Sequence, residues 1–456
     1  MKKLFGTDGI RGVAGTFPLD PGTVGYIGLA LGEILTKSGN AGRVVVGHDT
    51  RESGEWITGK LISSLTGCGI LDIHNVGVIT TPGLAFLTRL HQFDLGVMIS
   101  ASHNPYQDNG IKIFSRDGFK LSDELEADLE RSIYGLIESQ RPAPAIELKN
   151  ISHRNQELIQ DYRTFLINQA KTQLTSFEIG LDVCNGSAFS IAPEVFRELG
   201  ANLRLINDAP NGRNINDGCG SLHLESLIDL VSRFSLDFGV AFDGDADRSL
   251  SVTPSGRVFD GDFVLYAFSR YLRQTGQLKS GSVVGTVMTN FALEKALQEE
   301  GLELLRAPVG DKYVLEEMIR AGSNLGGEPS GHVILRDYHT TGDGILTTLK
   351  LAEILLKKSL SLDEVAKGFR PFPQVLDGIR IRQKVPLSES PEVLRVVEKT
   401  RSQLGSAGRI VVRYSGTEPI LRIMAEGENL DHVKRLVAEL KSRLLEILFS
   451  YDARPL

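Results

Sequence analysis

Short runs of β-branched and other apolar residues alternate with segments of helical periodicity along most of the chain. The runs at 43–51, 95–100 and 236–242 predict buried strands. This alternation is typical of α/β units built around mostly parallel sheets. With 456 residues, of which 41% are hydrophobic, the chain is long enough for three or four such units. A core of that size needs neither disulfides nor a structural metal in order to fold.

Changes in composition divide the chain into four predicted domains. A polar, Pro-containing stretch near residues 140–152 indicates a first border, and the Pro-rich sequence FRPFPQ at 369–374 indicates the last. We therefore expect α/β domains at 1–150, 151–250 and 251–370, and an α+β domain of strand, helix, two strands and helix at 371–456. The final helix carries an apolar stripe that predicts a core-facing side: Val433, Leu436, Val437, Leu440, Leu444 and Leu448.

Charge and cysteine usage narrow the choice of partner and compartment. A formal net charge of -7 argues against nucleic acid as the main partner, although a local basic pocket for a small anion stays open. The N-terminus has no apolar leader, and no apolar run approaches the roughly 18 residues of a membrane span. Cys68, Cys184 and Cys219 are isolated, which suits a reducing compartment and predicts neither a disulfide nor a zinc site. We expect a cytoplasmic protein without membrane contact; its oligomeric state is open, and a homodimer is one option.

The sequence DGDADR places Asp243, Asp245 and Asp247 directly after an apolar strand. In a loop with Gly and Ala spacers, three carboxylates at this spacing can converge on one hard divalent cation, and Mg²⁺ is preferred for oxygen ligands, with Mn²⁺ and Zn²⁺ as alternatives. An EF-hand does not fit, because its bidentate Glu would fall at Pro254. A phosphatase that uses Asp243 as its nucleophile is a second reading of the same loop.

Ser102 ends another predicted strand, in the loop SASHNP. An accessible serine in a loop of small residues can carry a phosphoryl group, and a metal held by the three aspartates could partly offset the phosphoryl charge. A turn or capping role is the alternative for Ser102 alone. His103 is a poor base for Ser102, because adjacent side chains of an extended chain point to opposite sides.

Two cationic residues accompany the serine. Arg11 lies in the glycine-rich FGTDGIRG, which we expect to be a loop before the first helix, and Lys112 lies in NGIKIF on a predicted strand. Either residue could be surface charge. Beside a phosphoserine, either could stabilise the transferring phosphoryl group or move the proton of a hydroxyl.

Two further loops offer groups for a sugar and for a phosphate. GGEPSGH presents Glu328, Ser330 and His332 at alternate positions, where carboxylate and hydroxyl groups can meet sugar hydroxyls. RYSGTEPILR combines hydroxyls, backbone N–H groups around a glycine and guanidinium forks, as a terminal phosphate requires. A plain turn is the alternative for each. The second loop contains Arg413, Ser415, Gly416, Thr417 and Arg422.

The four loops, taken in this order and at these intervals, resemble those of the α-D-phosphohexomutase superfamily along nearly the whole chain. The resemblance implies four domains around a central cleft, three similar α/β domains and a C-terminal α+β domain. It implies that Ser102 is the phosphorylated serine and shares one Mg²⁺ with the three aspartates. Glu328 and Ser330 match sugar-binding residues, and the set from Arg413 to Arg422 matches the loop that anchors the other phosphate. Arg11, Lys112 and His332 correspond to residues near the reacting centre.

The opening FGTDGIRG and the chain length resemble the branch of the superfamily that interconverts glucosamine 6-phosphate and glucosamine 1-phosphate on the route to UDP-N-acetylglucosamine. That activity implies an isomerase that works through glucosamine 1,6-bisphosphate, which also serves as activator. Two positions depart from the pattern: Pro329 stands where Gln is expected, and Ser100 where Thr is commoner. Pro329 keeps a phosphomannomutase or phosphoglucomutase as an alternative. A metal-dependent phosphatase and a non-catalytic sugar-phosphate sensor are more remote ones.

Overall fold

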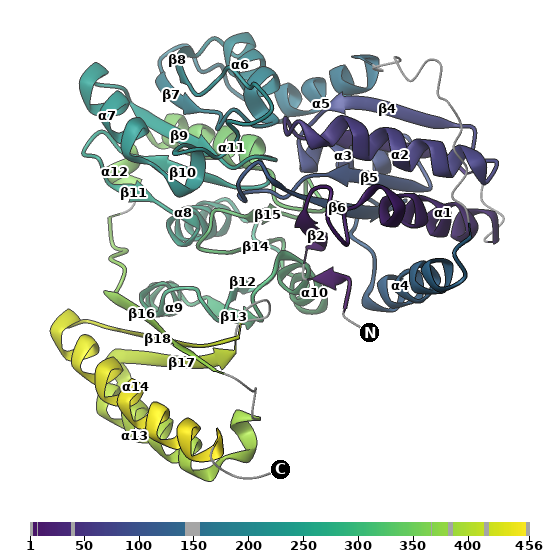
Figure 1. Ribbon diagram of the computed structural model, residues 1–456. Helices are drawn as coiled ribbons and strands as arrows, with labels where there is room; N and C mark the ends of the chain where they lie inside the picture. Colours follow the sequence, from purple (N-terminus) through teal and green to yellow (C-terminus); the bar gives the residue numbers. More distant parts are fainter. Residues whose placement is uncertain are drawn as a thin grey trace. The chain divides into compact units, whose positions relative to one another are not determined.

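A computed structural model describes residues 3–6, 8–37, 42–141, 156–365, 367–381, 386–414 and 419–452 (Figure 1). Packing divides the chain into two compact units. The first comprises Met1–Thr286 and Leu305–Lys367, and the second comprises Val287–Leu304 and Gly368–Leu456. Within the described residues, no helix is both long enough and apolar enough to cross a bilayer.

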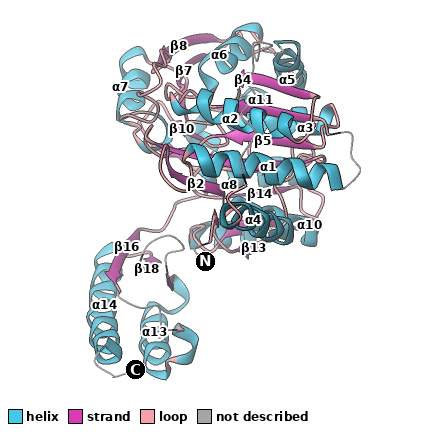
Figure 2. Cartoon of the chain, turned by 45° about the vertical axis from the view of Figure 1, so that its right-hand side comes forward, coloured by secondary structure: helices cyan, strands magenta, loops and turns pink. Residues whose placement is uncertain are grey.

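The first sheet has six strands in the order β1-β2-β6-β5-β3-β4. Strands β3, β4 and β5 are parallel, and β6 runs antiparallel to both β5 and β2. Helices α1 and α2 pack against each other (Figure 2). Buried apolar residues of α1, α2, α4, β3, β5 and β6 form one continuous core. The bounds are β1 (Phe5–Gly6), β2 (Gly9–Val13), α1 (Pro21–Lys37), β3 (Val44–His48), α2 (Ser53–Gly67), β4 (Ile73–Val78), α3 (Thr81–Leu90), β5 (Leu95–Ile99), β6 (Asp108–Ser115) and α4 (Asp123–Glu138).

The second sheet has five strands in the order β11-β10-β9-β7-β8. Parallel strands β8, β7 and β9 are joined at one edge by the antiparallel strand β10, so the turn from β9 to β10 lies where the parallel strands end. The bounds are α5 (Gln156–Gln169), β7 (Glu178–Asp182), α6 (Ala188–Glu198), β8 (Asn202–Ile206), α7 (Glu225–Phe234), β9 (Phe238–Phe242), β10 (Ser249–Val252) and β11 (Val258–Phe259), with a 3-10 turn at Gly220–Leu222.

The third sheet has four strands in the order β13-β12-β14-β15. Strands β14 and β15 form an antiparallel pair, and residues 328–332 make the turn between them. The bounds are α8 (Gly261–Gln274), β12 (Ser282–Thr286), α9 (Phe291–Glu299), β13 (Glu303–Ala307), α10 (Asp311–Ala321), β14 (Leu325–Gly327), β15 (Val333–Leu335), α11 (Gly344–Lys358) and α12 (Leu362–Val365).

The second unit contains an antiparallel sheet in the order β16-β18-β17, with α13 and α14 on one face (Figure 1). The predicted order of strand, helix, two strands and helix is confirmed. Five residues of the predicted apolar stripe on α14 are buried in the core, and Leu448 is partly buried against it. The bounds are β16 (Gln374–Arg380), α13 (Pro391–Leu404), β17 (Gly408–Tyr414), β18 (Ile420–Gly427) and α14 (Leu430–Asp452), with 3-10 turns at Leu387–Glu389 and Gly405–Ala407.

The predicted strands at 43–51, 95–100 and 236–242 are confirmed as β3, β5 and β9, and every residue of these strands is buried. The predicted border near residue 150 lies outside the described residues. The borders at 250 and 370 stay a prediction. The described residues form four sheets, and the second continues past the predicted border at 250, because β10 and β11 extend it to Phe259.

Candidate active site

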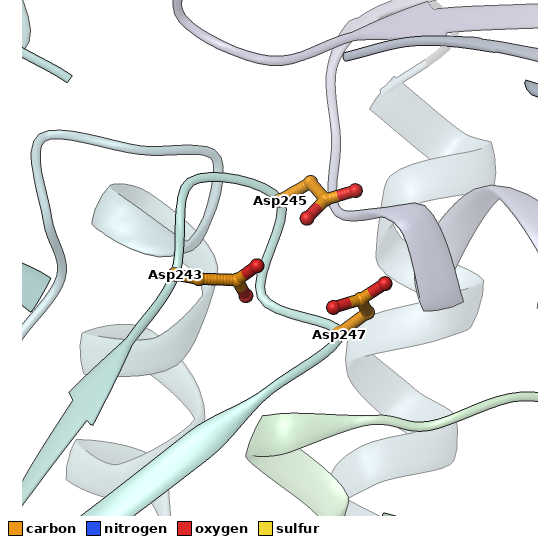
Figure 3. Close-up of side chains that lie close together, drawn as sticks. All are labelled: Asp243, Asp245 and Asp247. Atoms are coloured by element: carbon orange, nitrogen blue, oxygen red, sulfur yellow. The ribbon is translucent and has the colours of Figure 1, made fainter. Parts of the chain in front are cut away.

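The turn from β9 to β10 brings the three aspartates together. Asp243, Asp245 and Asp247 are buried, and one oxygen from each lies within 4.8 Å of the others. Ala246 has a left-handed backbone, with φ of 56°, which tightens the turn between the second and third aspartates. Figure 3 shows the three carboxylates converging on a common space.

The carboxylates of this cluster have the chemistry of a cation site. The Oδ1 atoms of Asp245 and Asp247 are buried and have no hydrogen-bond partner in the protein. Burial, and then the charges of Asp247 and Asp245, raise the pKa of Asp243 well above its usual value. A hard divalent cation would satisfy the orphaned oxygens and remove the repulsion, so the residues fit the metal that the sequence predicts.

Ser102 contacts this cluster directly. It follows β5, and its Oγ donates a hydrogen bond of 2.6 Å to Oδ2 of Asp243, a residue 141 positions later in the chain. The approach is close: a Cβ on Gly244 would lie 2.5 Å from the carbonyl oxygen of Ser102. Only glycine therefore allows the two loops to meet at this distance. The fold thus places the serine hydroxyl beside the acidic cluster. Ser102 is fully buried there, so the prediction that it is accessible is wrong.

The prediction that His103 points away from Ser102 is wrong. Nδ1 of His103 lies 3.3 Å from Oγ of Ser102. Ser102 has a left-handed backbone, with φ of 53°, so the alternation of an extended chain does not hold at this step. Burial, and then the charges of Arg248 and Arg11, lower the pKa of His103 to about 4. The imidazole is consequently neutral near pH 7. Because the hydroxyl proton of Ser102 is donated to Asp243, the tautomer protonated at Nδ1 is the one that can donate to Oγ of Ser102.

Lys112 lies on β6, as predicted, and is fully buried. Its Nζ is 2.8 Å from Oδ2 of Asp245 and 3.0 Å from Oδ2 of Asp8. Burial opposes the charge, but Asp245 and Asp8 outweigh burial and raise the pKa of Lys112 above its usual value. The lysine is therefore a cation at neutral pH, directed at the cluster that would hold a metal.

Arg11 lies on strand β2 and forms an ion pair with Asp8, so its prediction as a loop residue is wrong. The glycine-rich sequence forms a strand because β2 pairs with both β1 and β6. The Nε atom of Arg11 is buried without a hydrogen-bond partner. Strand pairing thus fixes the backbone of Arg11 while part of its guanidinium stays available.

Sequence reasoning missed Asp8 and Lys120. Asp8 forms ion pairs with Arg11, Lys112 and Lys120, and Nζ of Lys120 is 2.5 Å from Oδ2 of Asp311. Burial opposes ionisation of Asp8, but Lys112 and then Lys120 outweigh it and lower the pKa of Asp8 well below its usual value. An acid three residues before the arginine of a glycine-rich segment is the available signal for Asp8. Nothing local marks Lys120 or Thr81, whose Oγ1 donates to Oδ2 of Asp245.

The turn from β14 to β15 brings part of its predicted set to the acidic cluster. Nδ1 of His332 lies 3.6 Å from Oδ2 of Asp247, and Nε2 lies 3.8 Å from Oδ2 of Asp311. Burial opposes the charge on His332, but Asp247 outweighs it and raises the pKa of the imidazole. Oε1 of Glu328 accepts a hydrogen bond of 3.0 Å from the N–H of Gly310, and Oγ of Ser330 is buried without a protein partner.

In the second unit, Arg413 on β17 and Arg422 on β18 are directly paired across the sheet. Directly paired residues project from the same face, so the two guanidinium groups are neighbours of like charge. Burial, and then the charge of Arg422, lower the pKa of Arg413. A bound anion would relieve this repulsion. Ser415, Gly416 and Thr417, which the sequence predicts to join them, lie outside the described residues.

Four family models cover most of the chain. They are described as phosphoglucomutase/phosphomannomutase α/β/α domain I at residues 2–139, domain II at 157–256, domain III at 260–372 and the C-terminal domain at 379–442. The chain is 47% identical to a phosphoglucosamine mutase of Solibacter usitatus, with 95% of this chain and 96% of the relative covered. It is 42% identical to the phosphoglucosamine mutase of Bacillus subtilis, with 99% of each chain covered.

Solved structures share the fold at lower identity. A phosphoglucomutase/phosphomannomutase family protein from Burkholderia thailandensis matches with a TM-score of 0.78 and 23% identity, covering 97% of each chain. The N-acetylphosphoglucosamine mutase of Aspergillus fumigatus, solved in complex with GlcNAc-6P and magnesium, matches with a TM-score of 0.65 and 17% identity, covering 97% of this chain and 95% of that one. From the family models and the curated relatives together, the chain belongs to the phosphoglucomutase/phosphomannomutase family of the α-D-phosphohexomutase superfamily.

Proposed function

We propose that the protein is a phosphoglucosamine mutase, an isomerase that interconverts glucosamine 6-phosphate and glucosamine 1-phosphate through phosphorylated Ser102. The observation that carries the proposal is the 2.6 Å contact between Oγ of Ser102 and the buried aspartate cluster. The similarity of the chain to the phosphoglucosamine mutases of two bacteria supports glucosamine phosphate as the substrate. The product would feed the route to UDP-N-acetylglucosamine in the cytoplasm, and neither nucleic acid nor membrane takes part.

Phosphorylated Ser102 would need a cation beside it. A phosphoserine carries a charge of about -1.5 to -2, and the adjacent carboxylates would repel it. Ser102, Asp243, Asp245 and Asp247 would together hold one Mg²⁺ per subunit. When bound, Mg²⁺ offsets this negative charge and polarises the phosphoryl group towards attack.

The cationic residues around the cluster have separable roles in this proposal. Arg11 and Lys112 place positive charge where charge develops on the transferring phosphoryl oxygens. Against burial, Asp247 raises the pKa of His332, so its imidazolium gives a proton to the departing Oγ of Ser102 and is reprotonated by the proton of the attacking sugar hydroxyl. Arg11 and Lys112 hold their own protons throughout.

The remaining predicted residues bind the parts of the substrate that do not react. Glu328 and Ser330 accept and donate hydrogen bonds to sugar hydroxyls. Arg413, Ser415, Gly416, Thr417 and Arg422 bind the phosphate that is not transferred. The phosphoryl group moves from Ser102 to the free hydroxyl and gives glucosamine 1,6-bisphosphate. This intermediate then turns so that its other phosphate returns to Ser102, and added bisphosphate restores the phosphoserine of idle enzyme.

Coupled assays with glucosamine, glucose and mannose 1-phosphates test the proposed substrate, each in wild type and Ser102→Ala. We expect the highest kcat/KM for glucosamine 1-phosphate and no turnover by the variant. A much higher kcat/KM for glucose or mannose phosphate would make the protein a phosphoglucomutase or phosphomannomutase instead. Full activity of Ser102→Ala would favour a phosphatase using Asp243, and no turnover of any sugar by wild type primed with glucose 1,6-bisphosphate would leave a sugar-phosphate sensor.

A further inference from the structure

Both backbone polar groups of Ser102 are hydrogen-bonded within one buried network that is built on the ion pair of Asp49 and Arg51. Oδ2 of Asp49 accepts a hydrogen bond of 2.9 Å from Nε of Arg51 and one of 2.6 Å from Oγ of Ser100. The Ser100 hydroxyl in turn accepts from the N–H of Ser102 at 2.9 Å, and Nη2 of Arg51 donates to the carbonyl of Ser102 at 2.9 Å. Asp49, Arg51 and Ser100 thus close a ring around the Ser102 peptide groups.

Arg51 also fixes the rest of the loop. Its guanidinium donates to the carbonyls of Asn104 at 2.8 Å and Asp108 at 3.0 Å, and to that of Pro105. Arg51 is 1% exposed, and its side chain is wholly enclosed. A planar fork with five donors in fixed directions suits several carbonyls at once, whereas the single ammonium of lysine does not. The guanidinium is therefore the centre around which the Ser102 loop folds.

The hydrogen bonds of this ring hold Ser102 in a strained backbone conformation. Ser102 has φ of 53°, a left-handed conformation that a residue with a Cβ adopts only when its surroundings over-determine it. That same conformation sends Oγ of Ser102 to Asp243 and beside His103. From the second sheet's side, Nδ2 of Asn216 adds a bond of 2.8 Å to the carbonyl of Ser102 and one of 2.8 Å to that of Asn104.

We infer that Asp49, Arg51 and Ser100 are positioning residues for phosphoryl transfer, which keep Ser102 in its left-handed conformation so that Oγ meets the transferring group. None of the three contacts the acidic cluster's free oxygens, so their effect reaches the reaction through Ser102. The inference rests on the proposed role of Ser102 as phosphoryl carrier. A displacement of about 1 Å in a reacting atom is enough to slow a reaction by roughly 100-fold.

The test uses the full-length protein and three serine variants. Ser100→Ala removes the hydroxyl that joins Asp49 to the Ser102 N–H, and Ser100→Thr restores a hydroxyl. Ser269→Ala is the matched control, because Ser269 is equally buried and its Oγ bonds only the Tyr266 carbonyl within helix α8. Each protein is dephosphorylated, given glucose 1,6-bisphosphate, and followed by intact mass for the gain of one phosphoryl group at Ser102.

We expect two rates of Ser100→Ala to be about 10- to 100-fold lower than those of wild type: the uptake of the phosphoryl group at Ser102 and the turnover of the sugar phosphate. The KM for the sugar phosphate should be unchanged. Ser100→Thr should recover most of this loss, and Ser269→Ala should match wild type. The rise in Tm on adding Mg²⁺ alone should be the same for Ser100→Ala as for Ser269→Ala. Uptake and kcat of Ser100→Ala within twofold of wild type would overturn the inference, as would an equal loss in Ser269→Ala.

Arg51→Lys keeps the positive charge but removes the guanidinium group that bonds several carbonyls at once. We expect the rate of phosphoryl uptake at Ser102 to fall further in Arg51→Lys than in Ser100→Ala. If Arg51→Lys fails to fold, the serine variants decide alone. Failure of the proposed function would look different, since wild type itself would then take up no phosphoryl group at Ser102. Equal uptake by wild type and both loop variants would leave the phosphoserine in place and reject the positioning role.

Discussion

Nζ of Lys112 and Oδ2 of Asp245 lie 2.8 Å apart, and both side chains are fully buried. The ammonium group is one of the protein's own counter-ions to the acidic cluster, and it also lies 3.6 Å from Oδ2 of Asp247. A metal bound by the aspartates would therefore share their charge with Lys112. This relationship makes the stability of the site depend on which cations are present.

Lys112→Met should lower the free energy of unfolding by about 3–5 kcal/mol in metal-free buffer, because it leaves buried carboxylates without their partner. Saturating Mg²⁺ should recover part of the loss by supplying positive charge. Urea unfolding with EDTA and with Mg²⁺ measures both. Lys279→Met is the control: Lys279 pairs with Asp337 at the surface, where an ion pair is worth at most about 1 kcal/mol. Equal losses in the two variants would contradict the prediction.

Asp243→Asn should abolish the stabilisation by Mg²⁺ without destabilising the metal-free protein. Burial and the neighbouring carboxylates disfavour the charged form of Asp243, so a neutral amide of similar shape removes repulsion. Wild type should gain about 2.7 kcal/mol when the Mg²⁺ concentration is 100 times Kd. Thermal unfolding across a Mg²⁺ titration measures the gain, with Asp229→Asn on the surface of α7 as control. A Mg²⁺-dependent rise in Tm that survives in Asp243→Asn would place the metal elsewhere.

Asp343→Asn should stabilise the protein at pH 8 but not at pH 4. Burial raises the pKa of Asp343 to about 6, although it caps helix α11 through Leu346 N–H and accepts from the Tyr162 hydroxyl. A raised carboxyl pKa means that the folded state binds the proton more tightly than the unfolded state. Its contribution to stability is therefore full below pH 4 and is lost as the pH rises through about 6.

The loss amounts to roughly 1.4 kcal/mol per pKa unit, so the Asn variant should gain about 3 kcal/mol relative to wild type between pH 4 and pH 8. Urea unfolding of both proteins across this range measures it. Asp123→Asn is a control of opposite sign: the hydrogen bond from Lys312 lowers the pKa of Asp123, so removing its charge should not stabilise at pH 8. A gain in the free energy of unfolding of Asp343→Asn that does not change with pH would contradict a raised pKa of Asp343.

Gly244→Ala should destabilise the protein by about 1–3 kcal/mol and slow phosphorylation of Ser102, because the new methyl group would overlap the Ser102 carbonyl and push the two loops apart. Gly59→Ala in helix α2 is the matched control. A Cβ on Gly59 meets no atom within 4 Å, and alanine should stabilise the helix by up to about 1 kcal/mol. Chemical unfolding and intact mass after glucose 1,6-bisphosphate treatment measure the two effects. Unchanged phosphorylation in Gly244→Ala would show that the loops tolerate separation.

The sequence was most informative where chemistry and local structure coincide. Asp243, Asp245 and Asp247 follow an apolar strand, and Ser102 follows another, so their places at strand ends could be predicted from period and turn chemistry. The direction of the His103 side chain could not be predicted, because the left-handed turn at Ser102 depends on Arg51 and Asn216, which approach from distant segments. Lone residues such as Thr81 and Lys120 carry no local pattern, and only the packing of the domains directs them to the site.

The 141 residues between Ser102 and Asp243 have a consequence for synthesis. While the first domain leaves the ribosome it already contains the serine, but the carboxylates that would hold the metal have not been translated, nor has Asn216. At that stage the hydroxyl of Ser102 lacks the residues of the second domain that contact it, so we expect no reaction with a sugar bisphosphate. If Ser102 is the phosphoryl carrier, phosphorylation would require that the second domain has folded against the first.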